Sequence, residues 1–330
     1  MTDTSSYPLS QEAQFSQTMQ GPVAELWQHR QEGIFHGVDG LRIGWMAMTH
    51  TKNDKVIVVV NGRIESYWKY QETIYDLFQQ GYDVFSLDHR GQGVSDRLTT
   101  IHDLGHIAEF DDYVTDLKTL FDQIITPRGY QQHFMLGHSM GGTISSLFLS
   151  RFPNIIDRAA MTAPMHGIYL DNPVMKKISY PLLRLIDSLQ TQPQYTFTQK
   201  GYVAKPFIDN PYTHSEVRYQ WFRDLYQHKP ELQIGGPSSR WVWQGMRASQ
   251  HCIEQATNIQ APLLIIQAGN DRIVDNDKQQ QFLAAMQSGK GQLITIDGAN
   301  HELLFESDIY RNQSLNAILS HFANQSTVSQ

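Results

Sequence analysis

Short apolar runs alternate with helix-forming stretches along most of the chain. The runs have the length and composition of buried strands, and they lie at 55–60, 82–87, 132–136, 156–162, 262–267 and 292–296. Between them, the stretch 110–125 repeats apolar residues at helical spacing, and 67–80, 142–149 and 306–322 are also expected to be helical. Strands that alternate with helices predict a mostly parallel sheet with helices on both faces, which is the α/β class.

The beginning of the chain follows a different pattern. Residues 37–40 read Gly-Val-Asp-Gly and predict a hairpin turn between apolar segments at 34–35 and 41–48. A short helix is expected at 22–30, with Pro22 in its first turn. Residues 1–21 are polar and are expected to form a tail, as are residues 324–330 at the other end.

The alternation stops between residues 165 and 250. This stretch is rich in aromatic residues and carries a net charge of +4, whereas the rest of the chain carries −11. We expect a mainly helical cap at 165–250, inserted into a catalytic domain made of 22–164 and 251–323. Within this cap, 173–189 places Val174, Ile178, Leu185 and other apolar residues on roughly one helical face, with basic residues elsewhere.

Composition narrows the classes of function. The net charge of −7 argues against general nucleic-acid binding. Cys252 is the one cysteine, so no internal disulfide can form, which suits a reducing compartment. Residues 1–20 lack the basic and apolar regions of a signal peptide, and no apolar run is long enough to span a membrane. The sequence therefore predicts a cytoplasmic protein.

The most informative motif is Gly-His-Ser-Met-Gly at 137–141. A G-x-S-x-G pattern alone is weak, because chance supplies about 0.1 matches in a chain of this length. Here, however, it follows one of the predicted strands and opens a predicted helix. A strand, a sharp turn with serine at its apex, and a helix form the nucleophile elbow of serine hydrolases. We therefore predict that Ser139 is a nucleophile.

A serine nucleophile needs a base and an orienting carboxylate. Asp271 lies on the loop after the strand at 262–267, and His301 lies on the loop after the strand at 292–296. Asp275 is an alternative acid, and Asp297 can be read as a turn former. The order Ser, Asp, His and the three loop positions match a hydrolase triad. The sequence thus predicts catalytic roles for Ser139, Asp271 and His301.

The triad chemistry also needs two backbone N–H groups for the developing oxyanion. Met140 directly follows the nucleophile, and Arg63 lies just after the strand at 55–60, so their N–H groups are the candidates. The loop at 88–95 is interpreted as packing near the site. His102 and His106 have a possible metal-ligand spacing without an obvious third ligand, and the predicted chemistry requires no metal and no cofactor.

Taken together, the motifs resemble the bacterial lysophospholipase L-two family, within the monoacylglycerol-lipase-like branch of the α/β-hydrolases. The resemblance runs from about residue 22 to residue 322 and includes two segments of the predicted cap, which are its specific part. One departure is Asn61, where many lipase relatives carry histidine before the glycine. The resembling segments are 61–67, 88–93, 137–142, 162–165, 213–215, 218–219, 235–237 with Trp241, 274–276 and 301–306.

The resemblance implies an α/β-hydrolase fold and cleavage of the acyl ester of a lysophospholipid through an acyl-enzyme. Acyl transfer to a lipid acceptor is associated with the same family, whose members lie loosely on the inner membrane. Two readings of the apolar face of 173–189 stay open: it packs on the catalytic domain, or together with the basic residues it makes peripheral contact with anionic lipid. A monoacylglycerol lipase, a general carboxylesterase or a serine peptidase would share the triad. A non-catalytic lipid-binding protein on a hydrolase scaffold is an alternative from another class.

Overall fold

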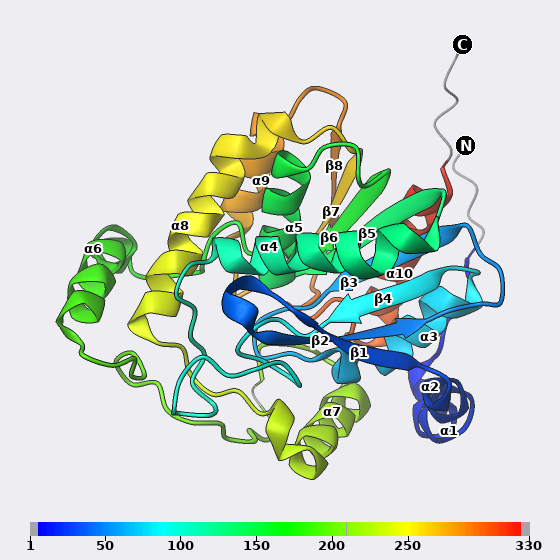
Figure 1. The fold of residues 1–330 in the computed structure, drawn as a ribbon, viewed down its shortest axis with the longest axis horizontal. Helices are drawn as coiled ribbons and strands as arrows, with labels where there is room; N and C mark the ends of the chain where they lie inside the picture. Colours follow the sequence, from blue (N-terminus) through cyan, green and yellow to red (C-terminus); the bar gives the residue numbers. More distant parts are fainter. Residues whose placement is uncertain (1–5, 209, 325–330) are drawn as a thin grey trace.

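A computed structural model describes residues 6–208 and 210–324 of the chain (Figure 1). Eight strands form one sheet in the order β1-β2-β4-β3-β5-β6-β7-β8. β1 and β2 form an antiparallel hairpin at one edge, β2 is antiparallel to β4, and the other neighbours are parallel. The strands are β1 Gln31–His36, β2 Arg42–Met48, β3 Lys55–Val60, β4 Asp83–Leu87, β5 Gln132–His138, β6 Arg158–Thr162, β7 Leu263–Ala268 and β8 Gly291–Ile296.

Helices cover both faces of this sheet, as the alternating sequence pattern predicts. α4, α5, α8 and α9 pack in a row, each against the next, while α3 and α10 contact the strands from the other side. The α-helices are α1 Phe15–Thr18, α2 Ala24–Gln28, α3 Gln71–Gln79, α4 Asp111–Leu120, α5 Met140–Arg151, α6 Pro173–Leu189, α7 Glu216–His228, α8 Ser239–Gln255, α9 Asn276–Ala285 and α10 Asp308–Ala323.

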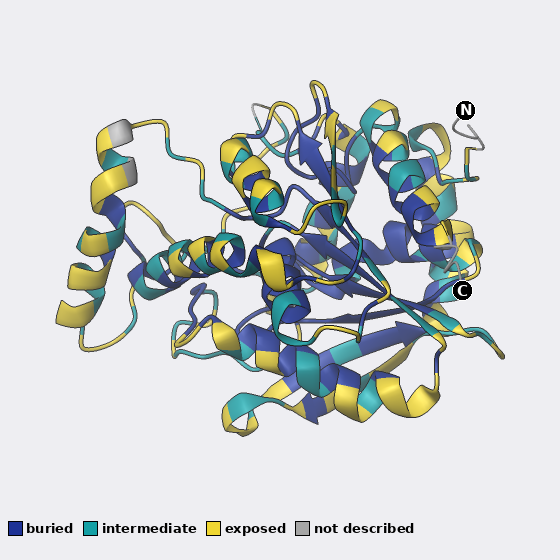
Figure 2. Cartoon of the chain, turned by 90° about the horizontal axis from the view of Figure 1, so that it is seen from above, coloured by how far each residue is buried: buried dark blue, intermediate teal, exposed yellow. Residues whose placement is uncertain are grey.

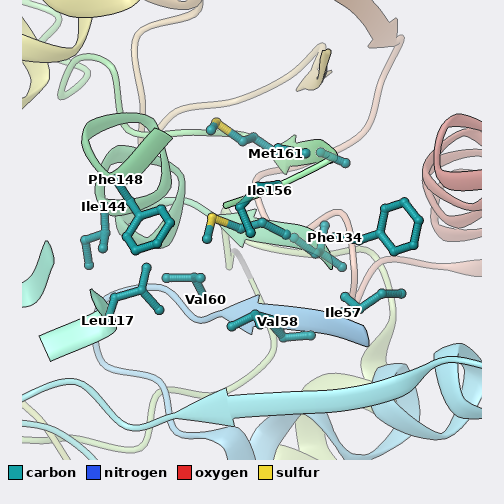
Figure 3. Close-up of a cluster of buried hydrophobic side chains, with 14 of the residues drawn as sticks. Ile57, Val58, Val60, Leu117, Phe134, Ile144, Phe148, Ile156 and Met161 are labelled. Atoms are coloured by element: carbon teal, nitrogen blue, oxygen red, sulfur yellow. The ribbon is translucent and has the colours of Figure 1, made fainter. Parts of the chain in front are cut away.

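The core is centred on the neighbouring strands β3 and β5. Val56 to Val60 of β3 are completely buried, which explains why this strand reads as an unbroken apolar run. Figure 3 shows Leu117 of α4 and Ile144 and Phe148 of α5 in one cluster with side chains of these strands. Because side chains on both faces of these strands are buried against helices, the helices have fixed positions over the sheet. The loops that join helices to strands are positioned with them.

The beginning of the chain departs from the expected polar tail. Residues 12–28 form short helical segments instead. Phe15, Met19 and Val23 are buried together and pack against Tyr75, Val217 and Trp221. Their spacing of four residues is helical, but the polar residues between them obscure it. Residues 1–5, and residues 325–330 of the expected second tail, lie outside the described part of the chain.

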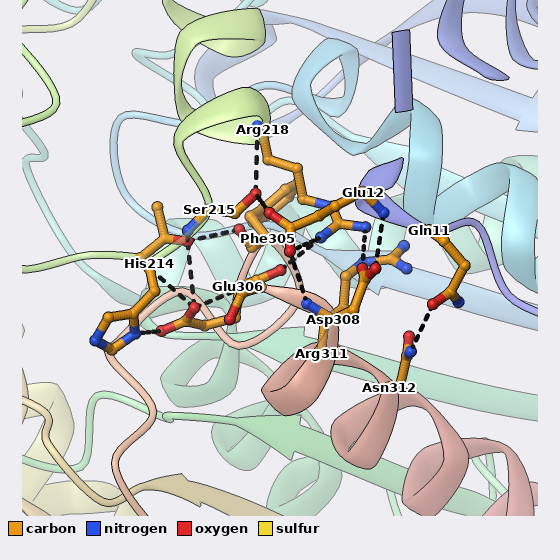
Figure 4. Close-up of polar contacts among 12 residues, drawn as sticks. Gln11, Glu12, His214, Ser215, Arg218, Phe305, Glu306, Asp308, Arg311 and Asn312 are labelled. Carbon is orange, nitrogen blue, oxygen red and sulfur yellow. Dashed lines mark hydrogen bonds and ion pairs between the residues drawn. The ribbon is translucent and has the colours of Figure 1, made fainter. Parts of the chain in front are cut away.

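A buried ionic cluster joins this N-terminal segment to α7 and α10 (Figure 4). The Arg218 guanidinium of α7 donates to Glu72 at 2.8 and 2.9 Å and to Asp308 at 2.9 Å. Glu12 accepts a hydrogen bond from the Ser215 hydroxyl, which caps α7. These contacts hold together segments that are distant in the sequence, and they fix the position of the N-terminal end of α7.

The stretch expected as a cap contributes α6, α7 and most of α8 between β6 and β7. The expected boundary at residue 250 falls inside α8, which continues to Gln255 and packs on α5 and α9. α6 contacts α8 and lies at the outer edge of the molecule, with much of its surface exposed (Figures 1 and 2). α8 therefore belongs both to the inserted stretch and to the helical layer on the sheet.

The crossing of α5 over β3 gives a direct test of this packing. A Cβ atom at Gly141 would lie 1.9 Å from the Val60 carbonyl oxygen. Because backbone atoms cannot yield as a flexible side chain does, we expect Gly141→Ala to lower the free energy of unfolding by about 1–3 kcal/mol or more. Chemical denaturation followed by circular dichroism measures this change.

Gly245→Ala on α8 is the matched control. Its Cβ would meet its nearest neighbour, the Met165 methyl group, at 3.6 Å, which is ordinary contact. Since alanine favours a helix over glycine by about 1 kcal/mol, this variant should be as stable as the unmodified protein or more so. Equal destabilisation by the two substitutions would contradict the close crossing.

Candidate active site

Ser139 lies at the apex of the turn between β5 and α5. Its backbone has φ 52° and ψ −117°, an unfavourable conformation for any residue other than glycine. Hydrogen bonds from the Ser139 N–H to Thr162 O at 3.1 Å and from the Met165 N–H to Ser139 O at 2.9 Å hold this strained turn. Gly137 lets β5 and α5 lie close together, because a Cβ atom at this position would lie 2.7 Å from the Ser145 hydroxyl oxygen of α5. This is the geometry of a nucleophile elbow.

The structure brings the three predicted triad residues together. His301 Nε2 lies 2.9 Å from Ser139 Oγ, and His301 Nδ1 lies 2.7 Å from Asp271 Oδ2. The other Asp271 oxygen accepts hydrogen bonds from the N–H groups of Ile273 and Val274 at 2.8 and 3.0 Å. These contacts orient the imidazole so that it can accept a proton from the serine hydroxyl.

The alternative acid, Asp275, has a different place. It is the N-terminal cap of α9 and accepts a hydrogen bond from the Asp277 N–H at 3.1 Å. A cap satisfies one of the N–H groups that a helix leaves without a partner at its start. Asp271, rather than Asp275, therefore contacts His301.

Charges around His301 favour its protonated form. Burial alone would lower the pKa of His301, but the charge and hydrogen bond of Asp271, followed by the charges of Glu302 and Glu65, raise it. Burial would raise the pKa of Asp271, but His301 and the N–H groups of Ile273 and Val274 lower it. The pair is thus arranged to stabilise an imidazolium next to a carboxylate.

A second group of buried charges lies beside the triad and escaped the sequence analysis. Lys69 Nζ lies 2.7 Å from Glu65 and 2.9 Å from Glu302, and the Lys69 side chain is almost inaccessible. Burial opposes ionisation of Glu65, but Lys69, His138 and the hydrogen bonds of Lys69 and Tyr70 lower its pKa to about 2. The i,i+4 pairing of Glu65 with Lys69 was the available signal, although such pairs usually lie on the surface.

Glu65 also fixes the loop that carries Arg63. Its carboxylate accepts hydrogen bonds from the Gly62 N–H and the Tyr70 hydroxyl, both at 2.6 Å. Gln92, from the loop expected to pack here, accepts from the Ile64 N–H at 3.1 Å and donates to Gly62 O at 3.0 Å. The loop is therefore held on two sides.

A pocket of about 180 Å³ opens onto Ser139. Arg63 borders it, and Met140, as the first residue of α5, has an N–H group without a partner inside the helix. Their roles as oxyanion donors remain a prediction. The other lining residues are Gly62, Ile64, Glu65, His138, Met165, Ile168, Tyr212, Trp241, Ile273, Val274, His301 and Glu302.

Two further features singled out in the sequence have structural partners. His106 Nδ1 lies 2.8 Å from the Ser238 hydroxyl oxygen, and residues 6–208 and 210–324 contain no group of three side chains that could hold a metal ion. The loop after β4 is packed inside, since the buried Asp88 carboxylate accepts hydrogen bonds from Ser66, Tyr67 and Val94.

Comparison with known proteins agrees with this geometry. Residues 51–308 match the sequence model of the family described as serine aminopeptidase, S33. The chain belongs to this S33 family. It is 36% identical over 325 residues to lysophospholipase L2 of Escherichia coli K12. The aligned region covers 95% of this chain and 93% of that protein.

More distant relatives extend the comparison. Monoacylglycerol lipase of Mycolicibacterium smegmatis is 23% identical over 281 residues, covering 84% of this chain and 92% of that protein. A soluble variant of monoglyceride lipase from Saccharomyces cerevisiae superimposes with a TM-score of 0.68 at 19% identity, covering 89% of this chain and 96% of that one. The fold of this S33-family chain is therefore that of the α/β-hydrolases, as expected.

The raised pKa of His301 has a measurable consequence. Protonated His301 cannot accept the serine proton, so kcat/KM for a neutral p-nitrophenyl ester should fall as the pH drops through a pKa above the usual value of 6.5. Glu302→Gln removes one of the charges that raise this pKa, and the acidic limb of the profile should move to lower pH.

Glu254→Gln, an exposed change on α8, is the control and should leave the profile in place. An acidic limb that is identical in Glu302→Gln and the unmodified enzyme would show that Glu302 does not act on His301.

Proposed function

We propose that this α/β-hydrolase is a lysophospholipase, an ester hydrolase that releases a free fatty acid and a glycerophospho-alcohol from a lysophospholipid. The observation that carries the proposal is the hydrogen-bonded chain from Ser139 through His301 to Asp271, which opens onto a pocket. The substrate class is supported by similarity to lysophospholipase L2 over almost the whole length of the chain.

The proposed reaction is a double displacement. His301, oriented by Asp271, takes the proton of Ser139 while Oγ attacks the ester carbonyl carbon. The N–H groups of Met140 and Arg63 stabilise the oxyanion, and the alcohol leaves with the proton from His301. Water, activated by His301, then hydrolyses the acyl-enzyme and releases the fatty acid. The residues of the site account for each step without a metal or cofactor.

Two related reactions use the same acyl-enzyme. Similarity to the M. smegmatis monoacylglycerol lipase makes a monoacylglycerol the alternative substrate. If the hydroxyl group of a lipid attacks the acyl-enzyme in place of water, the product is a transferred acyl chain. A non-catalytic lipid-binding role is disfavoured, because such a role gives no reason to hold Ser139, His301 and Asp271 in line.

The stretch 165–250 supplies much of the wall above the nucleophile, and we assign it the role of a cap. Met165, Ile168, Tyr212 and Trp241 border the pocket of Ser139 from this stretch. These side chains offer an apolar surface suited to a single acyl chain. The catalytic domain then consists of 22–164 and 251–323. α8 contacts α6 of the cap as well as α5 and α9 of the catalytic domain.

The outer surface of α6 supports peripheral contact with an anionic membrane. Leu183 and Ser179 face inward and are buried, whereas Val174, Leu185 and Leu189 are 61%, 56% and 75% exposed. Lys177 and Arg184 are exposed along the same helix. Apolar side chains beside basic ones are typical of helices that lie on anionic lipid. None of the helices within the described ranges is long and apolar enough to cross a bilayer.

The first experiment concerns the nucleophile and the substrate. Purified protein is given lysophosphatidylethanolamine, lysophosphatidylcholine, monoacylglycerol and a peptide amide in parallel, and products are measured by mass spectrometry. We expect fatty acid release from the lysophospholipids and its loss by a factor of about 10⁴ or more in Ser139→Ala. Ser145→Ala, a buried serine on α5, is the control.

A fluorophosphonate should label the unmodified protein and Ser145→Ala but not Ser139→Ala. Retained hydrolysis in Ser139→Ala would overturn the nucleophile, and cleavage confined to monoacylglycerol or to the peptide amide would overturn the substrate class.

The membrane proposal is tested by co-sedimentation with vesicles that contain phosphatidylglycerol. Replacing both Leu185 and Leu189 by serine should weaken binding, by about 1.5 kcal/mol or roughly tenfold for each leucine. Ile309→Ser on α10, where the side chain is 68% exposed, is the matched control. Binding that is insensitive to salt and to the double substitution would exclude α6 as the contact.

A further inference from the structure

A second cavity adjoins the pocket of Ser139. It has a volume of about 270 Å³ and shares Arg63, Ile64 and Tyr212 with that pocket. Its other walls come from 198–203, Lys205, Arg223 and 234–236, all within the stretch that covers the active site. A molecule whose ester lies at Ser139 can therefore extend past Arg63 into this second space.

The cavity is cationic in a chain that is acidic overall. Arg63, Lys200, Lys205 and Arg223 line it, and no carboxylate is among its described lining residues. The buried arginines elsewhere are paired: Arg90 with Asp116, Arg218 with Glu72 and Arg311 with Asp76. Arg63 and Arg223 form no ion pair within the described ranges. They are thus available to a negatively charged ligand.

Neutral partners hold both arginines in position. The Arg63 guanidinium lies 4.9 Å from the Trp241 ring and donates to Gly235 O at 2.7 Å, while that of Arg223 lies 4.6 Å from the Phe222 ring and donates to Tyr219. Arg223 also interacts with the Tyr202 hydroxyl group. Ring contacts and hydrogen bonds therefore hold both guanidinium groups at the wall of the cavity without neutralising their charge.

The charge of Arg63 persists despite its surroundings. Burial lowers the pKa of Arg63 to about 10, against smaller opposing contributions from Tyr113 and Tyr212. The guanidinium therefore remains protonated at neutral pH. Because no carboxylate of the described residues is paired with it, an anionic ligand in the cavity would not have to displace one from Arg63.

The backbone around the cavity is fixed as well. Asp103 accepts hydrogen bonds from the Tyr202 N–H at 2.6 Å and, through its carbonyl, from the Gly235 N–H at 2.7 Å. Lys200 O accepts from the Gly236 N–H at 2.8 Å. The segment that carries Lys200 is thereby bound to the segment that contacts Arg63, and the cavity is a built feature of the fold.

We propose that this cavity is a phosphate subsite, in which Arg63 and Arg223, with Lys200 and Lys205 at the rim, bind the headgroup phosphodiester of a lysophospholipid. The inference rests on the proposed function and deepens it. A lysophospholipid carries its phosphate on the same glycerol unit as the acyl ester, so adjoining sites are required. Arg63 then contacts the substrate twice, through its backbone N–H at the oxyanion and its side chain at the phosphate.

The test compares two substrates that differ in the phosphate. kcat/KM is measured for lysophosphatidylethanolamine and for the monoacylglycerol with the same acyl chain. In Arg223→Gln the ratio of the two values should fall about tenfold or more, because a charge-assisted contact to phosphate is lost. Arg223→Lys should restore part of the ratio, and Arg247→Gln, an exposed arginine on α8, should keep it unchanged.

A ratio that stays constant in Arg223→Gln would overturn the subsite, whether both activities persist or both fall together. Because a folding defect lowers both activities alike, it cannot imitate the expected result.

A second measurement separates this inference from the proposed function. Hydrolysis of p-nitrophenyl butyrate is followed with glycerophosphoethanolamine, glycerol or inorganic phosphate added. Glycerophosphoethanolamine should inhibit the unmodified protein and do so at least about tenfold more weakly in Arg223→Gln, whereas glycerol should not inhibit. This result would support the subsite even if lysophospholipids proved not to be substrates. Inhibition by inorganic phosphate alone would overturn the headgroup assignment in favour of a free-anion site.

Discussion

The parallel register of the central strands is the constraint on which the rest of the structure depends. Val60 of β3 pairs with Gly137 of β5, and Thr162 of β6 pairs with both His138 and Ile266. Parallel strands end at the same edge of a sheet, so the loops that follow them are neighbours although they are far apart in the sequence. Ser139, Asp271 and His301 meet because the sheet aligns the ends of the strands that precede them.

The register brings the loops together, but buried charges set their chemistry. Glu65 and Glu302 flank Lys69, and both carboxylates also act on His301. Burial opposes ionisation of Glu65, and the charge of Lys69 lowers its pKa. The same Glu65 holds the loop of Arg63 through the Gly62 N–H. One ionic group thus links the proposed oxyanion donor to the base, so that a change at Lys69 affects both.

The sequence was sufficient wherever a local pattern determined the structure. The apolar run of β3, the Gly-x-Ser-x-Gly turn and the loop positions of Asp271 and His301 each follow from short-range rules, and the structure places them as predicted. It was insufficient where contacts are long-range. The helices before residue 22 depend on Tyr75 and Trp221, and the pairing of Lys69 with Glu302 joins residues distant in the chain. The helical spacing of Phe15, Met19 and Val23 is obscured by the polar residues between them, and the pairing of Lys69 with Glu302 leaves no local pattern.

Arg63 shows how the general chemistry of a nucleophile elbow can be joined to a particular substrate. Its backbone belongs to the loop fixed by Glu65, whereas its side chain lies over Trp241 and donates to Gly235 of the covering stretch. The elbow can attack any acyl ester that reaches it, so discrimination must come from groups that contact the rest of the molecule. Arg63 forms no ion pair within the described ranges, and it belongs to the loop of the proposed oxyanion donor. In the proposed site, it therefore couples recognition of a phosphate to the reacting carbonyl. Selectivity would then appear in kcat as well as in KM, because the phosphate helps to position the loop used in the transition state.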